Sequence, residues 1–339
     1  MKIVLWPIQP TPQKKESFYS YICRTSNLNL GDLKANYKLL GVRYRPNNPN
    51  PIYLDEINTS IFTSLVVDNR VLNDWLLLER GAGNTDCFLF GQKFPRYLLS
   101  NKVKVCPFCL HDHNTFNSEW YFTHITTCIE HQCLLLDSCP SCIGLFSWSE
   151  DLIYQCAVCN MQWKDTGRYI ENYIKVEKLD VHKLLYYQLN KNNKLDKGQY
   201  PLEVLKLRYI DLVYVLSFFS WLASDHDDYW NGKYIDKLNI FEIYEGIQHA
   251  GEVILSWPAN FDISSAKMKT EKFNTRGINL LQSKFDVVSL DIEKLFPELS
   301  TQYRVDRTND FLEKLNKQKG TGGLELSDII YIAALNYLY

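Results

Sequence analysis

Eight potential metal ligands, arranged in four regular pairs, constrain this sequence more than any other feature. Two residues separate the members of each pair, which are Cys106 and Cys109, Cys128 and His131, Cys139 and Cys142, and Cys156 and Cys159. A gap of two residues lets the backbone turn so that both side chains reach one metal ion, and zinc prefers four such sulfur or nitrogen donors in a tetrahedron. The sequence therefore predicts two structural zinc ions per chain.

The order of the pairs favours two successive sites over interleaved ones. Eighteen, seven and thirteen residues separate successive pairs. In a cross-braced, RING-like arrangement the second and third pairs are nearly contiguous, whereas here residues 132–138 lie between them and include the apolar run Leu134–Leu136. We expect this run to form a short strand between a three-cysteine, one-histidine site and a four-cysteine site. Cross-bracing remains the alternative.

The remaining cysteine and histidine residues of this block have weaker patterns. Cys133 lies two residues past His131 and could replace it as the fourth ligand, but the matching gap of two residues favours His131. Cys133 is then a small buried thiol. We expect His111, His113 and His124 to be surface or packing residues because none has a partner at ligand spacing.

Nothing in the sequence indicates an enzyme. Both predicted zinc sites have four protein ligands, whereas a catalytic zinc keeps one position open for water. The deaminase pattern requires a His-x-Glu element upstream of Pro-Cys-x-x-Cys, and none precedes Cys139-Pro140-Ser141-Cys142. The chain also has no P-loop, no Gly-x-Gly-x-x-Gly and no Gly-x-Ser-x-Gly.

The apolar segments favour a cytoplasmic protein. Only Ile3–Trp6 are apolar between Lys2 and Pro7, which is too short for a signal peptide. The longest uncharged apolar segment, Leu212–Ala223, falls well short of the roughly 20 residues that span a bilayer. We expect it to be a buried helix, and we expect no membrane partner. A reducing cytoplasm also favours metal binding over disulfides for the ten cysteines.

Charge is balanced overall but basic at the start of the chain. The 339 residues carry a net charge of −2, whereas a protein that holds DNA tightly by itself is usually basic over most of one face. Residues 1–50 carry eight Lys or Arg against two acidic residues. This pattern fits a solvated helix face as well as a surface for nucleic acid or an acidic partner.

Helical periodicity on both sides of the cysteine block predicts a mainly α fold in three parts. These are an N-terminal helical, helix-turn-helix-like domain over 1–95, a tandem zinc-finger block with short strands over 96–172, and a C-terminal helical domain over 173–339. We expect the first two helices to cover Lys14–Asn27 and Leu33–Leu40, with Asp32 capping the second. Trp120, Trp148 and Trp163 are expected to form the small cores of the fingers.

Several further helices are expected. Apolar spacing predicts helices at 57–65 and 72–76, with a connector over Gly81–Pro95. Pro201 is placed to begin one long helix through Ala223, and another helix is expected over Phe241–Leu255. Ser289, Thr308 and Ser327 are plausible caps of three late helices.

The ordered motifs of the first half resemble the TniQ/TnsD family of bacterial transposon target-selection proteins. The similarity begins with Pro10 and Glu16-Ser17-Phe18-Tyr19-Ser20-Tyr21-Ile22-Cys23-Arg24, which is similar to the family's opening helix. It continues through Phe94-Pro95-Arg96, Cys106-Pro107-Phe108-Cys109-Leu110, Trp120, Cys128-x2-His131-x2-Leu134 and Cys139-Pro140-Ser141-Cys142. Trp257-Pro258 in the second half looks like members associated with type I-F CRISPR effectors.

This resemblance implies a homodimeric adaptor in RNA-guided transposition. Family members of this kind join a crRNA-guided Cascade complex, with its crRNA and DNA, to the transposition machinery and help to recruit the AAA+ regulator TnsC. The near-neutral charge fits an adaptor whose DNA specificity comes from guide-RNA pairing. Two alternatives stay open: a TnsD-type protein that reads an attachment site directly, with Leu33–Leu40 as recognition helix, and a RING- or LIM-like protein-interaction module.

Overall fold

The computed structural model describes residues 6–45, 52–53, 74–79, 86–166, 175–223 and 235–256. These residues belong to two compact units. The first unit lies within Met1–Lys194 and Asn239–Tyr244, and the second within Leu195–Leu238 and Glu245–Tyr339. The predicted division into three domains at residues 95 and 172 stays a prediction.

α-Helices are the main regular structure among the described residues, and the strands are short. The α-helices are α1 (Phe18–Leu28), α2 (Leu33–Leu39), α5 (Pro107–His113), α7 (Asp180–Leu189), α8 (Leu202–Lys206), α9 (Tyr209–Ala223) and α10 (Ile240–Leu255). The strands are β1 (Ile52–Tyr53), β2 (Leu77–Leu78), β3 (Asp86–Leu89), β4 (Gln92–Pro95), β5 (Thr127–Cys128) and β6 (Cys133–Leu134). Single 3-10 turns are η2 (Arg96–Leu98), η3 (Ser118–Tyr121), η4 (Trp163–Asp165), η5 (Lys197–Gln199) and η7 (Ile235–Lys237).

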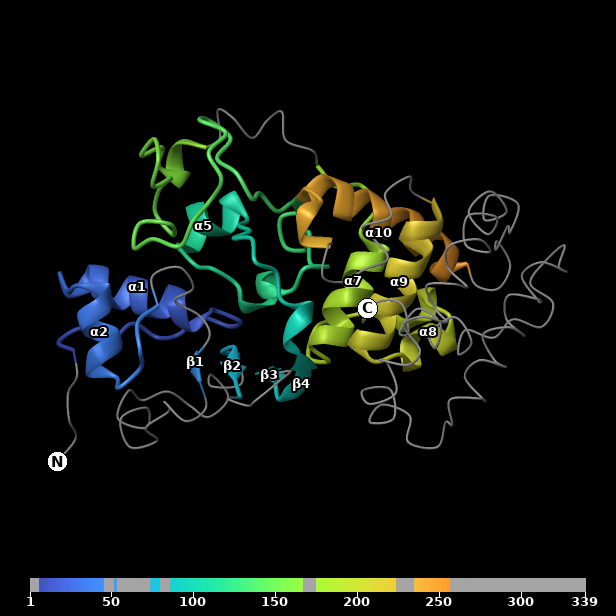
Figure 1. Ribbon diagram of the computed structural model, residues 1–339, viewed down its shortest axis with the longest axis horizontal. Coiled ribbons are helices and arrows are strands. Elements are labelled where there is room, and N and C mark those ends of the chain that lie inside the picture. Colours follow the sequence, from blue (N-terminus) through green and yellow to red (C-terminus); the bar gives the residue numbers. More distant parts are fainter. Residues whose placement is uncertain are drawn as a thin grey trace, which may run out of the picture. The chain divides into compact units, whose positions relative to one another are not determined.

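Side-chain caps set the starts of α1 and α2, which lie side by side (Figure 1). The Ser17 side chain accepts a hydrogen bond from the backbone N–H of Ser20, so α1 begins at Phe18 rather than at Lys14. The Asp32 side chain accepts from the N–H of Ala35 at the start of α2. The predicted cap at Asp32 is therefore confirmed.

A buried carboxylate explains the Glu16-Ser17-x-x-Ser20-x-x-x-Arg24 pattern. Glu16 is 1% exposed. The Arg24 guanidinium donates to both of its carboxylate oxygens, at 2.7 and 2.6 Å. The Ser20 hydroxyl and the Gln13 backbone N–H also donate to it, at 3.0 and 2.9 Å. Because a buried charge is costly without a partner, these four residues hold the start of α1 to the segment before it.

One side of α1 packs into an aromatic core. The Phe18 ring lies edge-on to Trp75 at 4.9 Å and to Tyr37 of α2 at 5.3 Å between centroids. The prediction of a helix at 72–76 is wrong for residues 74–76, which the structure describes. These residues form a turn that leads into β2. Trp75 is fully buried in this turn. The helix predicted at 57–65 lies outside the described residues.

The expected connector over Gly81–Pro95 contains a β-hairpin. Strands β3 and β4 pair antiparallel around a tight turn in which Phe90 and Gly91 both have positive φ, 52° and 72°. This is the turn geometry that suits the twist of a two-residue hairpin. The sheet order is β1-β2-β3-β4 (Figure 1), and β1 pairs with β2 in parallel.

The other side of α1 joins the cysteine block. The backbone N–H of Ser17 donates to the Phe116 carbonyl at 2.8 Å, and that of Ser118 donates to the Lys15 carbonyl at 2.9 Å. The Lys15 ammonium pairs at 2.9 Å with Glu119, whose side chain is fully buried. These contacts pair residues 15–17 with residues 116–119, and Glu16 and Asn117 form an antiparallel β-bridge between them.

The second unit contains a broken helix where a continuous one was expected. Helix α8 ends at Lys206 because Leu207 has an extended backbone, with φ −60° and ψ 142°. Helix α9 then begins at Tyr209. The helix predicted over Phe241–Leu255 is confirmed as α10, and the three late helices lie outside the described residues. None of the helices in the described ranges is long and apolar enough to cross a membrane.

Replacing Arg24 with alanine tests the buried ion pair. The substitution leaves the Glu16 carboxylate buried without its cation, so we expect the free energy of unfolding to fall by about 3 kcal/mol. Chemical denaturation of the metal-loaded protein measures this loss. Lys93→Ala is the control, because its partner Asp86 lies in an exposed pair and exposed pairs contribute little. Equal, small effects of both substitutions would show that the buried pair does not hold α1.

Candidate metal centres

The first two cysteines of the block lie at the start of α5. Cys106 is the N-cap residue, and its sulfur accepts a hydrogen bond from the backbone N–H of Cys109 at 3.5 Å. Pro107 occupies the first helical turn, where its fixed φ suits a helix start and its missing N–H is not needed. This local fold turns both sulfurs to the same side of the helix start.

Cys128 and His131 come from a second element, the β5–β6 hairpin. Cys128 and Cys133 are opposite each other in this antiparallel pair, and the turn between them carries His131. Gln132 adopts a positive φ of 49° at the end of the turn. The predicted strand at 134–136 is confirmed in part, since β6 covers Cys133–Leu134 and Leu136 makes an isolated bridge with Val105.

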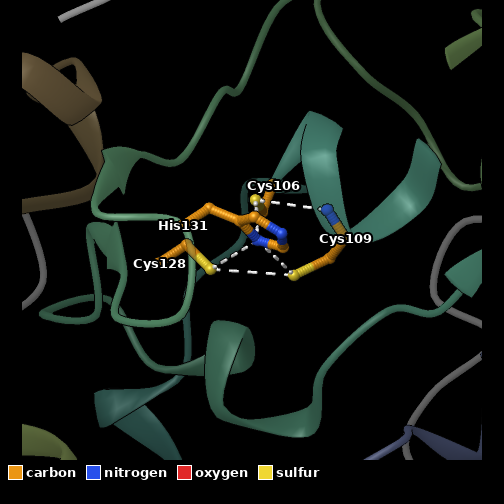
Figure 2. A group of neighbouring side chains, drawn as sticks. All are labelled: Cys106, Cys109, Cys128 and His131. Carbon is orange, nitrogen blue, oxygen red and sulfur yellow. Dashed lines mark hydrogen bonds between the residues drawn. The ribbon is translucent and has the colours of Figure 1, made fainter. Parts of the chain in front are cut away.

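Three sulfurs surround the His131 ring nitrogen (Figure 2). The Nδ1 atom lies 3.5 Å from the sulfur of Cys106, 3.3 Å from that of Cys109 and 3.6 Å from that of Cys128. The Cys109 and Cys128 sulfurs are 3.6 Å apart. In a tetrahedral zinc site the ligand bond lengths place sulfurs about 3.8 Å from each other and about 3.5 Å from a nitrogen. The four atoms therefore have the spacing of a tetrahedral metal site.

Neighbouring side chains hold the His131 ring in place. Its outer nitrogen, Nε2, lies 3.1 Å from a carboxylate oxygen of Asp112 on α5. The Phe108 ring stacks on the imidazole at 5.5 Å between centroids. A carboxylate at the second nitrogen of a ligating histidine fixes the tautomer and strengthens the ligand. Sequence analysis missed Asp112, although its place three residues after Cys109 on the same helix was a usable signal.

The second group is built from two knuckles with the same backbone pattern. In each, the first cysteine's carbonyl accepts from the N–H four residues later, at Ile143 (2.9 Å) and Asn160 (2.8 Å). Both of these residues have positive φ, 60° and 58°. The sulfurs of Cys139 and Cys156 each accept from the N–H two residues later, at 3.4 Å. This repeat turns each pair of thiols inward.

The second group also has tetrahedral spacing, but it lies closer to solvent. The sulfurs of Cys139 and Cys159 are 3.7 Å apart, and those of Cys142 and Cys156 are 3.9 Å apart. Cys159 is exposed, whereas all three cysteines of the first group are buried. In both groups the four ligand atoms lie within 4.8 Å of one another. The structure thus groups the eight residues sequentially and not cross-braced.

The thiols of each group differ in pKa. It is lowered for Cys106, Cys128 and Cys159, which favours the thiolate that binds metals, and raised for Cys109, Cys139 and Cys142. The pKa of Cys128 lies well below its usual range because Cys106 and Cys109 hydrogen-bond to its sulfur. The pKa of Cys159 is lowered to about 7 because the backbone N–H of Met161 hydrogen-bonds to it. The pKa of His131 is raised to about 11 by the sulfurs of Cys106 and Cys128.

The other histidines of the block lie outside the two groups. His111 and His113 are exposed, and His124 is buried. Burial, with the Lys104 ammonium nearby, lowers the pKa of His124 to about 3. Buried Lys104 donates to the carbonyls of Phe122, Thr123 and Ile125. It thus holds the segment that leads to Cys128, a role that sequence reasoning did not identify.

The three tryptophans of the block pack in different places. Trp163 is buried in the second finger, where its indole N–H donates to the Leu152 carbonyl at 2.7 Å. Trp120 packs on Phe116 at 5.1 Å between centroids. Trp148 is half-buried and packs against Tyr19 of α1 at 4.9 Å. Trp148 therefore connects the second finger to α1.

Asp112 offers a direct test of the first group. We expect Asp112→Asn to weaken metal binding there by about 10- to 100-fold, the usual effect of removing the partner of a ligating histidine. Competition with a chromophoric chelator measures this affinity. Glu130→Gln is the matched control, since Glu130 is exposed on the same hairpin as His131 and lies near His113 instead. Equal affinities for Asp112→Asn and the unaltered protein would show that Asp112 does not support the ligand.

Comparison with known proteins agrees with the N-terminal motifs. The TniQ family model matches residues 7–135, and no curated protein matches the chain. The matched region contains the buried Glu16–Arg24 pair and all four residues of the first group, while the second group follows it. By this match the chain contains a TniQ domain at residues 7–135.

Proposed function

We propose that this protein is a target-selection adaptor of RNA-guided transposition, most like the TniQ of type I-F CRISPR-associated transposons. In this role it joins a crRNA-loaded Cascade complex to the transposition machinery and helps to recruit the AAA+ regulator TnsC. The observation that carries the proposal is the TniQ domain at residues 7–135. The net charge of −2 supports it further, because a near-neutral protein makes few net phosphate contacts and needs a partner to hold DNA.

Both groups of ligands suit structural zinc. Each offers four protein donors, three thiolates with one imidazole or four thiolates, which is the donor set that zinc takes in closed structural sites. Such a site leaves no coordination position for a water nucleophile. We therefore assign zinc a role in folding and the protein no catalytic step.

Exposed apolar side chains support self-association through the N-terminal helices. Leu30 is 97% exposed in the turn between α1 and α2, and Ile8, Leu28 and Leu39 are about half exposed. We propose a symmetric homodimer in which the N-terminal helices of one protomer meet the C-terminal helices of the other. Light scattering at micromolar concentration checks this, and a monomer would contradict it.

One observation favours a second candidate, a TnsD-type protein that reads DNA directly. Helix α2 follows α1 after a short turn, and its Lys34 and Lys38 side chains are exposed on one helix. A basic second helix of this kind is what a helix-turn-helix protein places in the major groove.

Elemental analysis of the purified protein checks the zinc assignment. We expect two zinc ions per chain. Cys109→Ser and Cys156→Ser should each lose one ion and give insoluble or locally unfolded protein, because structural zinc contributes on the order of 10 kcal/mol to the folding of small domains. A folded wild-type protein without zinc would contradict the assignment.

Co-elution with Cascade separates the two functions. We expect the protein to co-elute with crRNA-loaded Cascade, and to bind free duplex weakly and without sequence preference. This weak binding should come mainly from Lys14, Lys15, Lys34, Lys38, Arg43 and Arg45 and be lost near physiological salt.

Charge reversal on α2 provides the companion test. Replacing Lys34 and Lys38 with glutamate should leave the choice of DNA target unchanged in the adaptor model, because base pairing to the guide reads the sequence. A footprint on one defined sequence at physiological salt by the unaided protein, abolished by these two substitutions, would establish the TnsD-type function instead.

A further inference from the structure

A fifth sulfur lies against the first group of ligands. The Cys133 sulfur is 3.7 Å from that of Cys106, which is the spacing of two sulfurs on one tetrahedral zinc. Cys133 is therefore in contact with one of the three thiols that surround His131, and it stands opposite a second, Cys128, in the β5–β6 pair.

The β5–β6 hairpin fixes this position through its backbone. Cys128 and Cys133 are directly opposite in the antiparallel pair, where facing Cβ atoms lie about 4.5–5.5 Å apart. The Cys133 backbone also makes a bridge with Lys175 on its other side. These two backbone contacts hold the Cys133 sulfur beside the first group of ligands.

His131 and Cys133 differ in their exposure to solvent. The His131 side chain is 18% exposed and lies at the outer edge of the group, whereas Cys133 is 7% exposed. A displaced imidazole can leave toward solvent, while the Cys133 thiol remains in the interior. One hairpin therefore carries two donor side chains at the first group, His131 within it and Cys133 beside it.

From this geometry we propose that Cys133 is a reserve ligand of the first metal site, which takes the fourth position when the His131 imidazole is absent. The inference rests on the metal binding proposed above. In the exchange the Cys133 thiol gives its proton to solvent, and its thiolate binds where Nδ1 of His131 was bound. No electron is transferred. The site changes from three sulfurs and one nitrogen to four sulfurs.

Cobalt(II) substitution of the full chain tests this proposal. Sulfur-to-cobalt charge-transfer absorbance rises with the number of thiolate ligands, so it reports the donor set directly. We expect His131→Ala to stay folded, to keep two cobalt ions and to gain one thiolate ligand, from seven to eight. His131→Ala combined with Cys133→Ser should keep only the ion of the second group.

A matched double variant controls for the loss of a buried thiol. Cys87 is fully buried in β3 and belongs to neither group, so His131→Ala with Cys87→Ser should keep both ions. If the Cys133 double variant is insoluble while the Cys87 double variant stays soluble with two ions, the proposal is equally supported.

Four other outcomes would overturn the inference, and the last of them would also contradict the metal binding on which it rests. Insoluble His131→Ala protein, or His131→Ala protein with one ion, would show that Cys133 does not replace the imidazole. A third outcome is that His131→Ala and the double variant His131→Ala with Cys133→Ser both keep two ions and show unchanged absorbance. This result would show that a ligand other than Cys133 replaces the imidazole. A folded wild-type protein that binds no cobalt would instead contradict the proposed metal sites themselves.

Discussion

The convergence of three thiols and one imidazole at the first group is the constraint on which the first unit depends. These donors come from the start of α5 and from the β5–β6 hairpin, which are eighteen residues apart in the chain. Bringing four such donors together without a cation would leave buried thiols competing for protons, as the lowered pKa of Cys128 and the raised pKa of His131 indicate. A divalent cation bound at this group would replace those protons and fix both segments at once.

The position of α1 follows from this group. Residues 116–119 come directly after α5 and bond to residues 15–17, and the Lys15–Glu119 ion pair closes the same contact. From the other end of the block, Trp148 packs on Tyr19. The buried Glu16–Arg24 pair then fixes the start of the helix. The TniQ domain at residues 7–135 contains both this helix and the first group.

The two groups of four residues could be predicted from sequence because the spacing within each pair specifies the local turn, and the cap at Asp32 could be predicted from its place before a helical pattern. Features that depend on distant packing could not. Trp75 follows Leu72 at helical spacing in the sequence. In the structure its ring packs in the core beside Phe18, and the chain continues into β2. The break at Leu207 lies in a segment that has no internal Gly or Pro to predict it. The contacts of Asp112 with His131 and of Cys133 with Cys106 depend on how α5 and the β5–β6 hairpin are placed together.

Hydrogen exchange of the α1 amides with and without metal tests most directly whether the first group supports the N-terminal helices. Local opening exposes amides in cooperative units, so residues that depend on the same contacts lose protection together. Removal of metal by a chelator should lower protection in α1 (Phe18–Leu28) along with α5 (Pro107–His113). Unchanged protection in α1 while α5 loses its own would contradict this account, because the helix would then be held by contacts that do not depend on the metal site.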